Sequence, residues 1–253
     1  MICSQASSCR GFVSMYKPRE YRSWIRNSGL VSFEVVEKET DLFISVSKDL
    51  EGEALDSVIN YRKDIDDYIK RAPAFRTTLE PMKAREDAPP IVRAMCEAGS
   101  KAGVGPMAAV AGAVAEFVGR DLMKFSDEII VENGGDIFMA TGKKRVIGVY
   151  AGEESPFTGK LAVEIAPAKN GVGVCTSSGT VSHSLSFGKA DAALIISGDA
   201  PLADAVATAT GNRVKTAADI EGAIEFAKSV EGVMGVLILI GSKMGSWGSV
   251  RLV

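Results

Sequence analysis

A run of six strand-like segments in the second half of the chain constrains the fold more than any other feature. Each segment is short and apolar, and several connections between them are tight turns such as Thr141-Gly-Lys-Lys144. Turns this short join antiparallel neighbours, whereas parallel strands need long crossovers. The run therefore predicts a mainly antiparallel sheet system, with strands at residues 128–132, 136–140, 145–151, 161–166, 172–176 and 190–197.

The rest of the chain adds a hairpin, several helices and two closing strands. Segments 32–38 and 41–46 read as paired strands joined at Glu39-Thr40. Residues 51–71 carry apolar side chains at helical spacing with charges on the other face, as a helix packed on a sheet does. The fold class is α+β, with mainly antiparallel sheets and several helices in a single compact domain over residues 31–253. The remaining helices are predicted at 88–102, 107–123, 201–210 and 217–230, and the closing strands at 233–240 and 247–253.

The first thirty residues differ from this domain and predict a basic N-terminal arm on the surface. This segment contains five basic side chains, one acidic side chain, Glu20, and no apolar periodicity. It also lacks the apolar stretch of a secretory signal. Met15 is an alternative start, and a chain beginning there would lack Cys3 and Cys9.

The charge balance excludes two classes of partner. The chain has 29 basic and 32 acidic side chains, a net charge of −3 and an isoelectric point near 5.4. It therefore has no global positive field to hold nucleic acid or anionic lipid. Its longest uncharged apolar stretches, 103–115 and 232–241, fall short of the roughly 18 residues of a membrane span. We expect a soluble protein that acts on a small molecule or a protein acceptor, without nucleic-acid or membrane partners.

Cysteine and histidine are scarce in this chain. The four cysteines are too few for a disulfide scaffold and lack C-x-x-C spacing, so we expect a reducing, cytoplasmic location. His183 is the only histidine, which excludes a multi-histidine metal site and leaves one imidazole to shuttle protons. Any chemistry must rely on carboxylates, hydroxyls, thiols and backbone groups.

Three segments combine glycine with polar side chains at strand ends, where a backbone can approach a ligand closely. The first contains Asn133, Gly134, Gly135 and Asp136, which permit positive φ, expose amides and add a carboxylate. A plain turn explains Asn-Gly-Gly about equally well. Cofactor binding at these four residues is therefore one of two interpretations.

The second segment, residues 171–183, brings a strand and its cysteine into a run of hydroxyls. Successive amides in such a turn can form an anion-binding nest, which would lower the pKa of a thiol placed against it. The candidate catalytic residues are Cys175, Ser177 and His183. The alternatives are a cysteine buried as a small apolar residue and a histidine that caps a loop. The candidate cofactor-binding residues here are Thr176, Ser178, Gly179 and Thr180.

The third segment, residues 197–211, predicts a helix with Asp199 at its N-cap and Pro201 in its first turn. Asp204 and Thr208 are four residues apart and share one helical face. A carboxylate and a hydroxyl placed together could hold an oxygen-seeking cation such as Mg²⁺. Spacing alone is weak evidence, because such pairs are common on helices.

A helix followed by these three segments resembles the ApbE superfamily, whose best-known members are FAD:protein FMN transferases. From about Phe33 the chain is more closely similar to an uncharacterised family with an ApbE-like fold, which shares Cys-Thr-Ser-Ser-Gly-Thr, His-Ser-Leu-Ser-Phe-Gly-Lys-Ala-Asp and Lys-Met-Gly-Ser-Trp-Gly. The resemblance implies Mg²⁺ and FAD as cofactors, with Asp204 and Thr208 as metal-binding residues. It also matches Gly134, Gly135 and Asp136 to the transferase's glycine pair before an acidic residue, and 176–179 to its Thr-Ser-Gly strand end.

Two elements of the transferase pattern are absent from this chain. Where those enzymes carry Lys-Gly-Tyr-Ala followed by an aspartate, the helix reads Met107-Ala-Ala-Val-Ala-Gly112. The His-x-x-Asp-Pro-x-Thr-Gly segment is reduced to His183-Ser-Leu-Ser186. The pair that resembles a metal site is thus present without the complete set of FAD-binding and catalytic elements.

Three functions remain open at this point. The favoured one is sulfur handling, a thiol or persulfide relay in sulfide assimilation that needs an accessible Cys175 of low pKa, with Cys96 as a second thiol and His183 as a proton partner. The alternative is Mg²⁺-dependent cleavage of FAD with transfer of FMN to a hydroxyl. The third is a non-catalytic flavin or nucleotide binder or a scaffold. The Gly/Ala-rich helix at 107–123 could also face a second subunit, so a homo-oligomer stays open.

Overall fold

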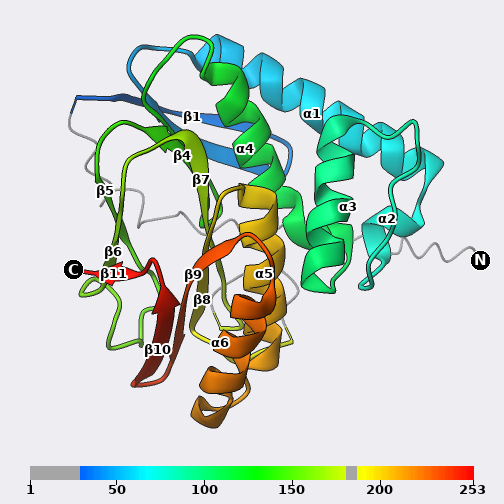
Figure 1. Ribbon diagram of the computed structural model, residues 1–253. Helices are drawn as coiled ribbons and strands as arrows, with labels where there is room; N and C mark the ends of the chain where they lie inside the picture. The colour runs from blue at the N-terminus through cyan, green and yellow to red at the C-terminus, as the bar shows by residue number, and fades with distance from the viewer. Residues whose placement is uncertain (1–28, 181–186) are drawn as a thin grey trace, which may run out of the picture.

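The main sheet has eight strands, and every neighbouring pair in it is antiparallel. The computed structural model describes residues 29–180 and 187–253; the predicted basic arm up to residue 28 and His183 lie outside them. The strand order is β1-β2-β3-β4-β7-β8-β9-β10 (Figure 1). The bounds are β1 Val31–Glu37, β2 Thr40–Val46, β3 Ile129–Asn133, β4 Asp136–Thr141, β7 Ala168–Ser177, β8 Ala192–Ser197, β9 Val233–Ile240 and β10 Lys243–Gly248.

A second, three-stranded sheet covers part of one face of the main sheet. Its order is β11-β6-β5, and its strands are β5 Arg145–Gly148, β6 Ala162–Ile165 and β11 Arg251–Leu252. The prediction of one closing strand over residues 247–253 is therefore wrong, because this range holds the end of β10 and the separate strand β11. Gly248 ends β10 at φ 75°, where a side chain would lie 2.2 Å from the Met234 carbonyl, and the chain then passes from one sheet to the other.

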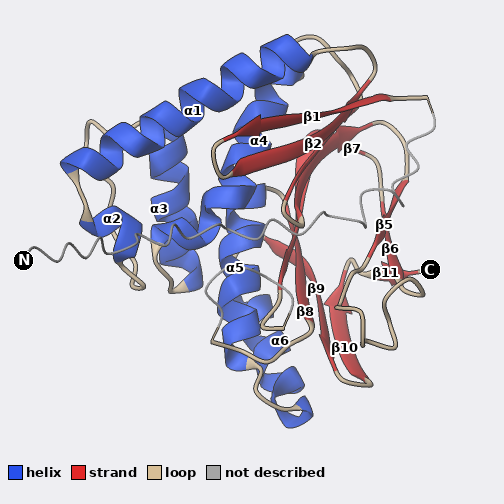
Figure 2. Cartoon of the chain, turned by 180° about the vertical axis from the view of Figure 1, so that it is seen from behind, coloured by secondary structure: helices blue, strands red, loops and turns tan. Residues whose placement is uncertain are grey.

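Helices cover the opposite face of the main sheet, as the two views show (Figures 1 and 2). The predicted helices are present, and the one expected at 107–123 begins as a short 3₁₀ turn. The sequence did not indicate α2. The bounds are α1 Glu51–Arg71, α2 Ala74–Thr77, α3 Pro90–Ala102, η2 Pro106–Ala109, α4 Val110–Leu122, α5 Ala200–Arg213, η3 Ala217–Asp219 and α6 Ile220–Ser229. The α+β fold with mainly antiparallel sheets is confirmed.

Side chains of the central strands alternate between two apolar cores, because successive residues of a strand point to opposite faces. Cys175, Ile195 and Val236 belong to the core under the helices. Their neighbours Val174 and Leu194 belong to the core under the small sheet. The main sheet is thus buried on both faces, and the three strands that carry the predicted motifs are fixed from both sides.

The small residues of α4 are used for packing within this chain. An ideal Cβ on Gly112 would lie 2.3 Å from the Ala200 carbonyl oxygen, and one on Gly119 would lie 2.4 Å from the Phe138 ring. These contacts to α5 and β4 account for the glycines without a second subunit. Among the described residues, no single helix has the length and apolarity to cross a membrane; α3 with η2 and α4 reaches them only as a pair bent by 105°.

Candidate functional site

The three glycine-containing segments predicted from the sequence meet at the beginning of α4. The β3–β4 turn, the end of β7 and the first half of α5 each contribute a buried polar side chain there. These are Asp136, Cys175 and Asp204, which lie close enough for the two carboxylates to affect each other and the thiol electrostatically. This meeting point, defined by these three residues, is called the carboxylate site below.

The β3–β4 turn is a two-residue hairpin built by two glycines. Gly134 and Gly135 have φ values of 68° and 103°, the positive values that a tight turn of this kind requires. Asn133 pairs with Asp136 across the turn, and its side-chain Nδ2 donates to the Ala111 carbonyl at 3.1 Å. The turn therefore places Asp136 beside the beginning of α4.

Asp136 is buried without a positively charged partner among the described residues. Its carboxylate accepts the Thr176 amide at 3.2 Å and lies beside the Cys175 thiol. Burial, the nearby Asp204 carboxylate and, to a lesser degree, Glu132 raise the pKa of Asp136 well above its usual range. The protonated form is therefore favoured as long as no cation is bound.

Asp204 projects from α5 onto the first turn of α4. Its carboxylate accepts the amides of Ala111 and Gly112, the latter at 2.9 Å from Oδ2. These amides have no carbonyl partner at a helix start, so Asp204 satisfies the groups that an N-cap side chain would satisfy. Burial raises the pKa of Asp204 from 3.8 to about 7, although the two amides act in the opposite direction.

The start of α5 is satisfied in the same way by a carboxylate from α4. Glu116 Oε2 accepts the Ala200 amide at 2.6 Å, and Asp199 accepts the Leu202 amide at 2.8 Å. Pro201 has no amide hydrogen, so each remaining donor in the first turn of α5 has a partner. Sequence reasoning missed Glu116; the available signal was a single acid that ends a long uncharged stretch of Ala, Val and Gly.

Cys175 does not have the properties that a sulfur relay needs. Its side chain is 0% exposed, and its thiol donates to the Ala200 carbonyl at 3.5 Å. Burial, and then the Asp136 and Asp204 carboxylates, raise its pKa well above the ordinary value. The prediction that Cys175 has an accessible thiol of low pKa is therefore wrong. The Ile137 amide in β4 acts against that rise, but burial outweighs it, because the alternation along β7 points this side chain into the core.

The amides expected to form an anion-binding nest already have protein partners. Gly135 donates to Glu132 Oε1 at 2.7 Å, and Gly179 donates to the Ala190 carbonyl at 2.9 Å. The Thr180 amide donates to Ser178 Oγ at 3.2 Å, and its hydroxyl donates to Asp191. These contacts hold the β3–β4 turn and the end of β7 in place without a ligand. A cofactor-binding role for these residues stays a prediction.

The remaining candidates are not part of the carboxylate site as defined here. Thr208 is partly buried on α5, one turn beyond Asp204, and Ser177 is the partly buried last residue of β7, next to Gly211. Cys96 is buried in α3, and burial raises its pKa. His183 lies outside the described residues, so its proposed pairing with Cys175 stays a prediction.

The carboxylate site fits a hard divalent cation better than a soft one. Neither Asp136 nor Asp204 forms an ion pair with a described lysine or arginine, so each carries an unneutralised charge when ionised. No group of three or more His, Cys, Asp or Glu side chains in the described ranges forms a complete metal site. Mg²⁺ suits such an incomplete set, because proteins hold it through one or two carboxylates together with water and substrate phosphates.

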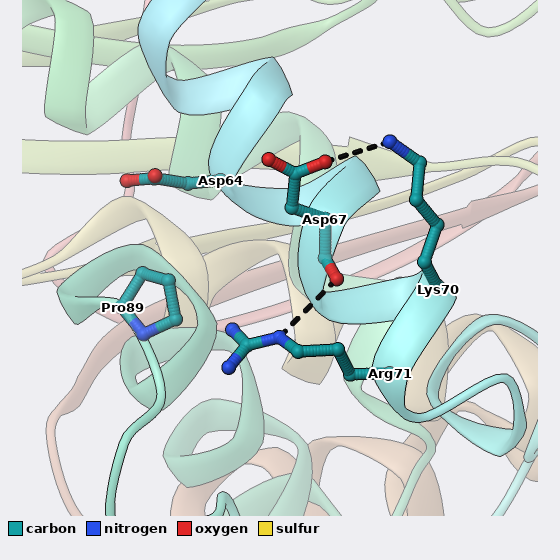
Figure 3. A pocket seen from close by; sticks show the side chains of 5 residues that line it. All are labelled: Asp64, Asp67, Lys70, Arg71 and Pro89. Carbon is teal, nitrogen blue, oxygen red and sulfur yellow. Dashed lines mark hydrogen bonds and ion pairs between the residues drawn. The ribbon is translucent and has the colours of Figure 1, made fainter.

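Two surface hollows lie outside this site. The larger, of about 460 Å³, is lined by Asp64, Asp67, Lys70, Arg71 and Pro89 (Figure 3). Lys70 pairs with the Asp67 carboxylate at 2.7 Å, and Arg71 donates to the Asp67 backbone carbonyl and pairs with the Asp87 carboxylate at 2.7 Å, so both basic side chains already have acidic partners. The smaller, of about 220 Å³, lies between α3, α4 and the start of α5 and reaches Glu116. None of the residues predicted from the sequence to form the site lines either hollow.

Comparison with known proteins places relatives of this chain among uncharacterised archaeal proteins. A UPF0280 protein from Methanocella arvoryzae is 44% identical over 215 residues, which cover 83% of this chain and 86% of that protein. A UPF0280 protein from Methanococcus aeolicus is 41% identical over 217 residues, covering 84% of each chain. These names carry no activity.

Solved structures with the same fold include flavin transferases. The apo form of Pseudomonas stutzeri flavinyl transferase ApbE aligns with a TM-score of 0.59 and 12% identity over 87% of this chain and 94% of that one. The flavin transferase ApbE from Vibrio cholerae aligns with a TM-score of 0.58 and 10% identity over 87% and 97% of the two chains. At this identity the likeness establishes the fold, and the ApbE-like architecture expected from the motifs is confirmed.

A family model covers most of the chain. The model described as AbpE bacteria matches residues 22–232, a range that includes the β3–β4 turn, the end of β7 and α5. The motifs, the fold and the sequence relatives therefore agree, and the chain belongs to the AbpE bacteria family, whose structural neighbours are the ApbE flavin transferases.

Proposed function

We propose that this protein is a magnesium-dependent enzyme that cleaves the pyrophosphate of FAD and transfers the FMN unit to a hydroxyl group of an acceptor protein. The observation that carries the proposal is the pair of buried carboxylates, Asp136 and Asp204, which converge from β4 and α5 without a described positive partner. Asp204 stands at the position where the resemblance to flavin transferases implies a metal-binding aspartate.

The electrostatics of the carboxylate site support a bound cation. Burial raises the pKa of both acids, and the Asp204 carboxylate raises that of Asp136 further, so ionising both is costly without a compensating charge. A divalent ion would supply that charge, with Asp204 and the Thr208 hydroxyl as its protein ligands and Asp136 close by. When bound, Mg²⁺ neutralises phosphate oxygens and stabilises the charge that develops during phosphoryl transfer.

The chain's own residues then have defined roles. Asp204 holds its position through the amides of Ala111 and Gly112, so its carboxylate is oriented before any ligand arrives. The Thr176 amide orients Asp136 in the same way. In the reaction, a phosphoester forms between the FMN phosphorus and the acceptor oxygen, the phosphoanhydride bond breaks, AMP leaves with the bonding electron pair, and the proton of the acceptor hydroxyl is released.

This chain departs from the flavin-transferase pattern in residues that would contact FAD. The Lys-Gly-Tyr-Ala element is replaced by Met107-Ala-Ala-Val, so the recognition of FAD by this chain must use other side chains. FAD contacts are therefore proposed at the β3–β4 turn, Gly134 to Asp136, and at the strand end, Thr176 to Thr180. The named activity of the solved neighbours supports the substrate class.

Incubation with FAD, Mg²⁺ and a threonine-bearing acceptor protein tests the proposal. We expect release of AMP and covalent flavin on the acceptor, both lost with a chelator and in Asp204→Asn. The control is Asp56→Asn, which changes an exposed aspartate on α1. Free FMN with AMP but an unlabelled acceptor would support cleavage and contradict transfer. A folded protein that releases neither product and shows no thermal shift with FAD and Mg²⁺ would contradict the proposal in favour of a scaffold.

A further inference from the structure

Glu116 is a buried charged residue on α4, and the residues that precede it in this helix are all Ala, Val or Gly. It is 4% exposed, its Oε2 accepts the Ala200 amide at 2.6 Å, and its Oε1 pairs with Arg120 at 2.6 Å. Burial raises its pKa, while the Ala200 amide and Arg120 act against that rise, and Asp199 is the other charged group that faces it. A carboxylate in such a place needs a structural or functional reason.

Its position relative to Asp204 supplies the reason. Glu116 lies four residues after Gly112 on α4, and Asp204 lies four residues after Ala200 on α5, so each pair shares one helical face. The Gly112 amide donates to Asp204, and the Ala200 amide donates to Glu116. Each helix start is thus satisfied by a carboxylate one turn along the other helix, and the two contacts fix one register between the helices.

Close backbone contacts make this register sensitive to small movements. An ideal Cβ on Gly173 would lie 2.4 Å from the Ala200 Cα, and the Cys175 thiol also donates to the Ala200 carbonyl. Ala200 is therefore enclosed by β7, α4 and the Glu116 carboxylate. A movement of Ala200 would also move Asp204, because the two residues lie one turn apart on α5.

We infer that Glu116 is a positioning residue, which holds the first amide of α5 and thereby keeps Asp204 against the amides of Ala111 and Gly112. The consequence for metal affinity rests on the proposed function. The positioning of Asp204 by Glu116 does not rest on the proposed function, because the hydrogen bond from Gly112 to Asp204 exists in the metal-free protein and can be measured there.

Amide hydrogen exchange in the metal-free protein tests the geometry. Glu116→Asp keeps the charge but withdraws the carboxylate from Ala200, and we expect exchange at both Ala200 and Gly112 to rise at least about tenfold relative to Val236 in β9. Glu116→Gln keeps the length and an acceptor oxygen, so it should keep both amides protected. Val163→Ala, in the other core, is the control for general destabilisation and should leave the ratio of Gly112 to Val236 unchanged.

Magnesium titration tests the consequence for the carboxylate site. We expect Glu116→Asp to weaken Mg²⁺ binding about tenfold, as loss of a residue that orients a metal ligand does, and Glu116→Gln to restore most of the affinity. Unchanged Gly112 exchange and unchanged Mg²⁺ affinity in Glu116→Asp would overturn the inference. A wild-type protein that binds no Mg²⁺ would overturn the proposed function, and the exchange measurement would still decide whether Glu116 positions Asp204.

Discussion

Burial of Asp204 lowers the stability of the fold at neutral pH, yet it leaves a carboxylate suited to the proposed binding of a cation. Its ordinary pKa of 3.8 rises to about 7 on burial, because two backbone amides do not replace the hydration that the ionised carboxylate loses. The folded protein therefore holds a proton on Asp204 where the unfolded chain does not. This side chain contributes stability that is fully present below a pH of about 4, falls progressively as the pH rises, and is lost above a pH of about 7.

Asp204→Asn should therefore stabilise the metal-free protein at pH 8. An amide keeps an oxygen for the Gly112 hydrogen bond and carries no charge, so we expect a gain of about 2–4 kcal/mol in the free energy of unfolding at pH 8 and little change at pH 3, where Asp204 is protonated in both the folded and the unfolded chain. Urea denaturation at the two pH values measures the difference. Asp56→Asn should change neither value, and a loss of stability in Asp204→Asn at pH 8 would show that the carboxylate is compensated in a way that the contacts do not reveal.

Burial of Cys175 leads to a second prediction at this scale. Its thiol is enclosed and its pKa is raised, so we expect alkylation by iodoacetamide at pH 7.5 to be at least about 100-fold slower in the native protein than in urea. Peptide mapping after timed quenching measures this for each cysteine, and the same sample in urea is the control. Fast native alkylation would revive the sulfur-relay hypothesis.

Single residues of the carboxylate site were predictable to different degrees. Asp204 was found through its spacing from Thr208 and the family resemblance, and Asp136 through its glycine turn. The environment of Cys175 was mispredicted, because burial depends on which face of β7 meets the helices. Glu116 was missed, because its partner Ala200 is 84 residues away and the bond is to a backbone amide.

At the scale of elements, the contact between α4 and α5 depends on the absence of a side chain at Gly112. Gly112→Ala would place a methyl group 2.3 Å from the Ala200 carbonyl, which forces the helices apart. We expect a loss of about 1–3 kcal/mol in unfolding free energy together with weaker Mg²⁺ binding.

Gly222→Ala is the matched control for that substitution. Gly222 lies on α6, where an added Cβ meets open space, so the same change should be neutral or stabilising by up to about 1 kcal/mol. Chemical denaturation of both variants gives the comparison. Equal effects at the two glycines would show that helix propensity, and not the contact with α5, governs Gly112.

Most elements were predictable from periodicity, and the exceptions have a physical reason. Helices such as α1 bury one stripe, and strands such as β9 are continuous apolar runs, so both give strong local signals. β10 is an exposed edge strand with the pattern Lys243-Met-Gly-Ser, which lacks that signal. The division into two sheets depends on a turn at Gly248 and on pairing with the distant β6, which no local pattern encodes.

For the whole molecule, pH and magnesium should act on stability together. The metal binds the deprotonated form of Asp204, so protons compete with it below a pH of about 7. We expect the apparent Mg²⁺ affinity to be about tenfold higher at pH 8 than at pH 6, with net proton release on binding. Calorimetry in two buffers of different ionisation enthalpy measures both quantities. Equal affinity at the two pH values would contradict a ligand role for Asp204.

The reciprocal contacts between α4 and α5 also bear on the order of folding. They join residues 84 and 92 positions apart, whereas β1 with β2 and β3 with β4 form through short hairpins. Contacts that close long loops tend to form late, so an intermediate with its hairpins paired would lack the carboxylate site. Mg²⁺ should then slow unfolding and leave the refolding rate nearly unchanged, which makes the ion a reporter of the last step of folding.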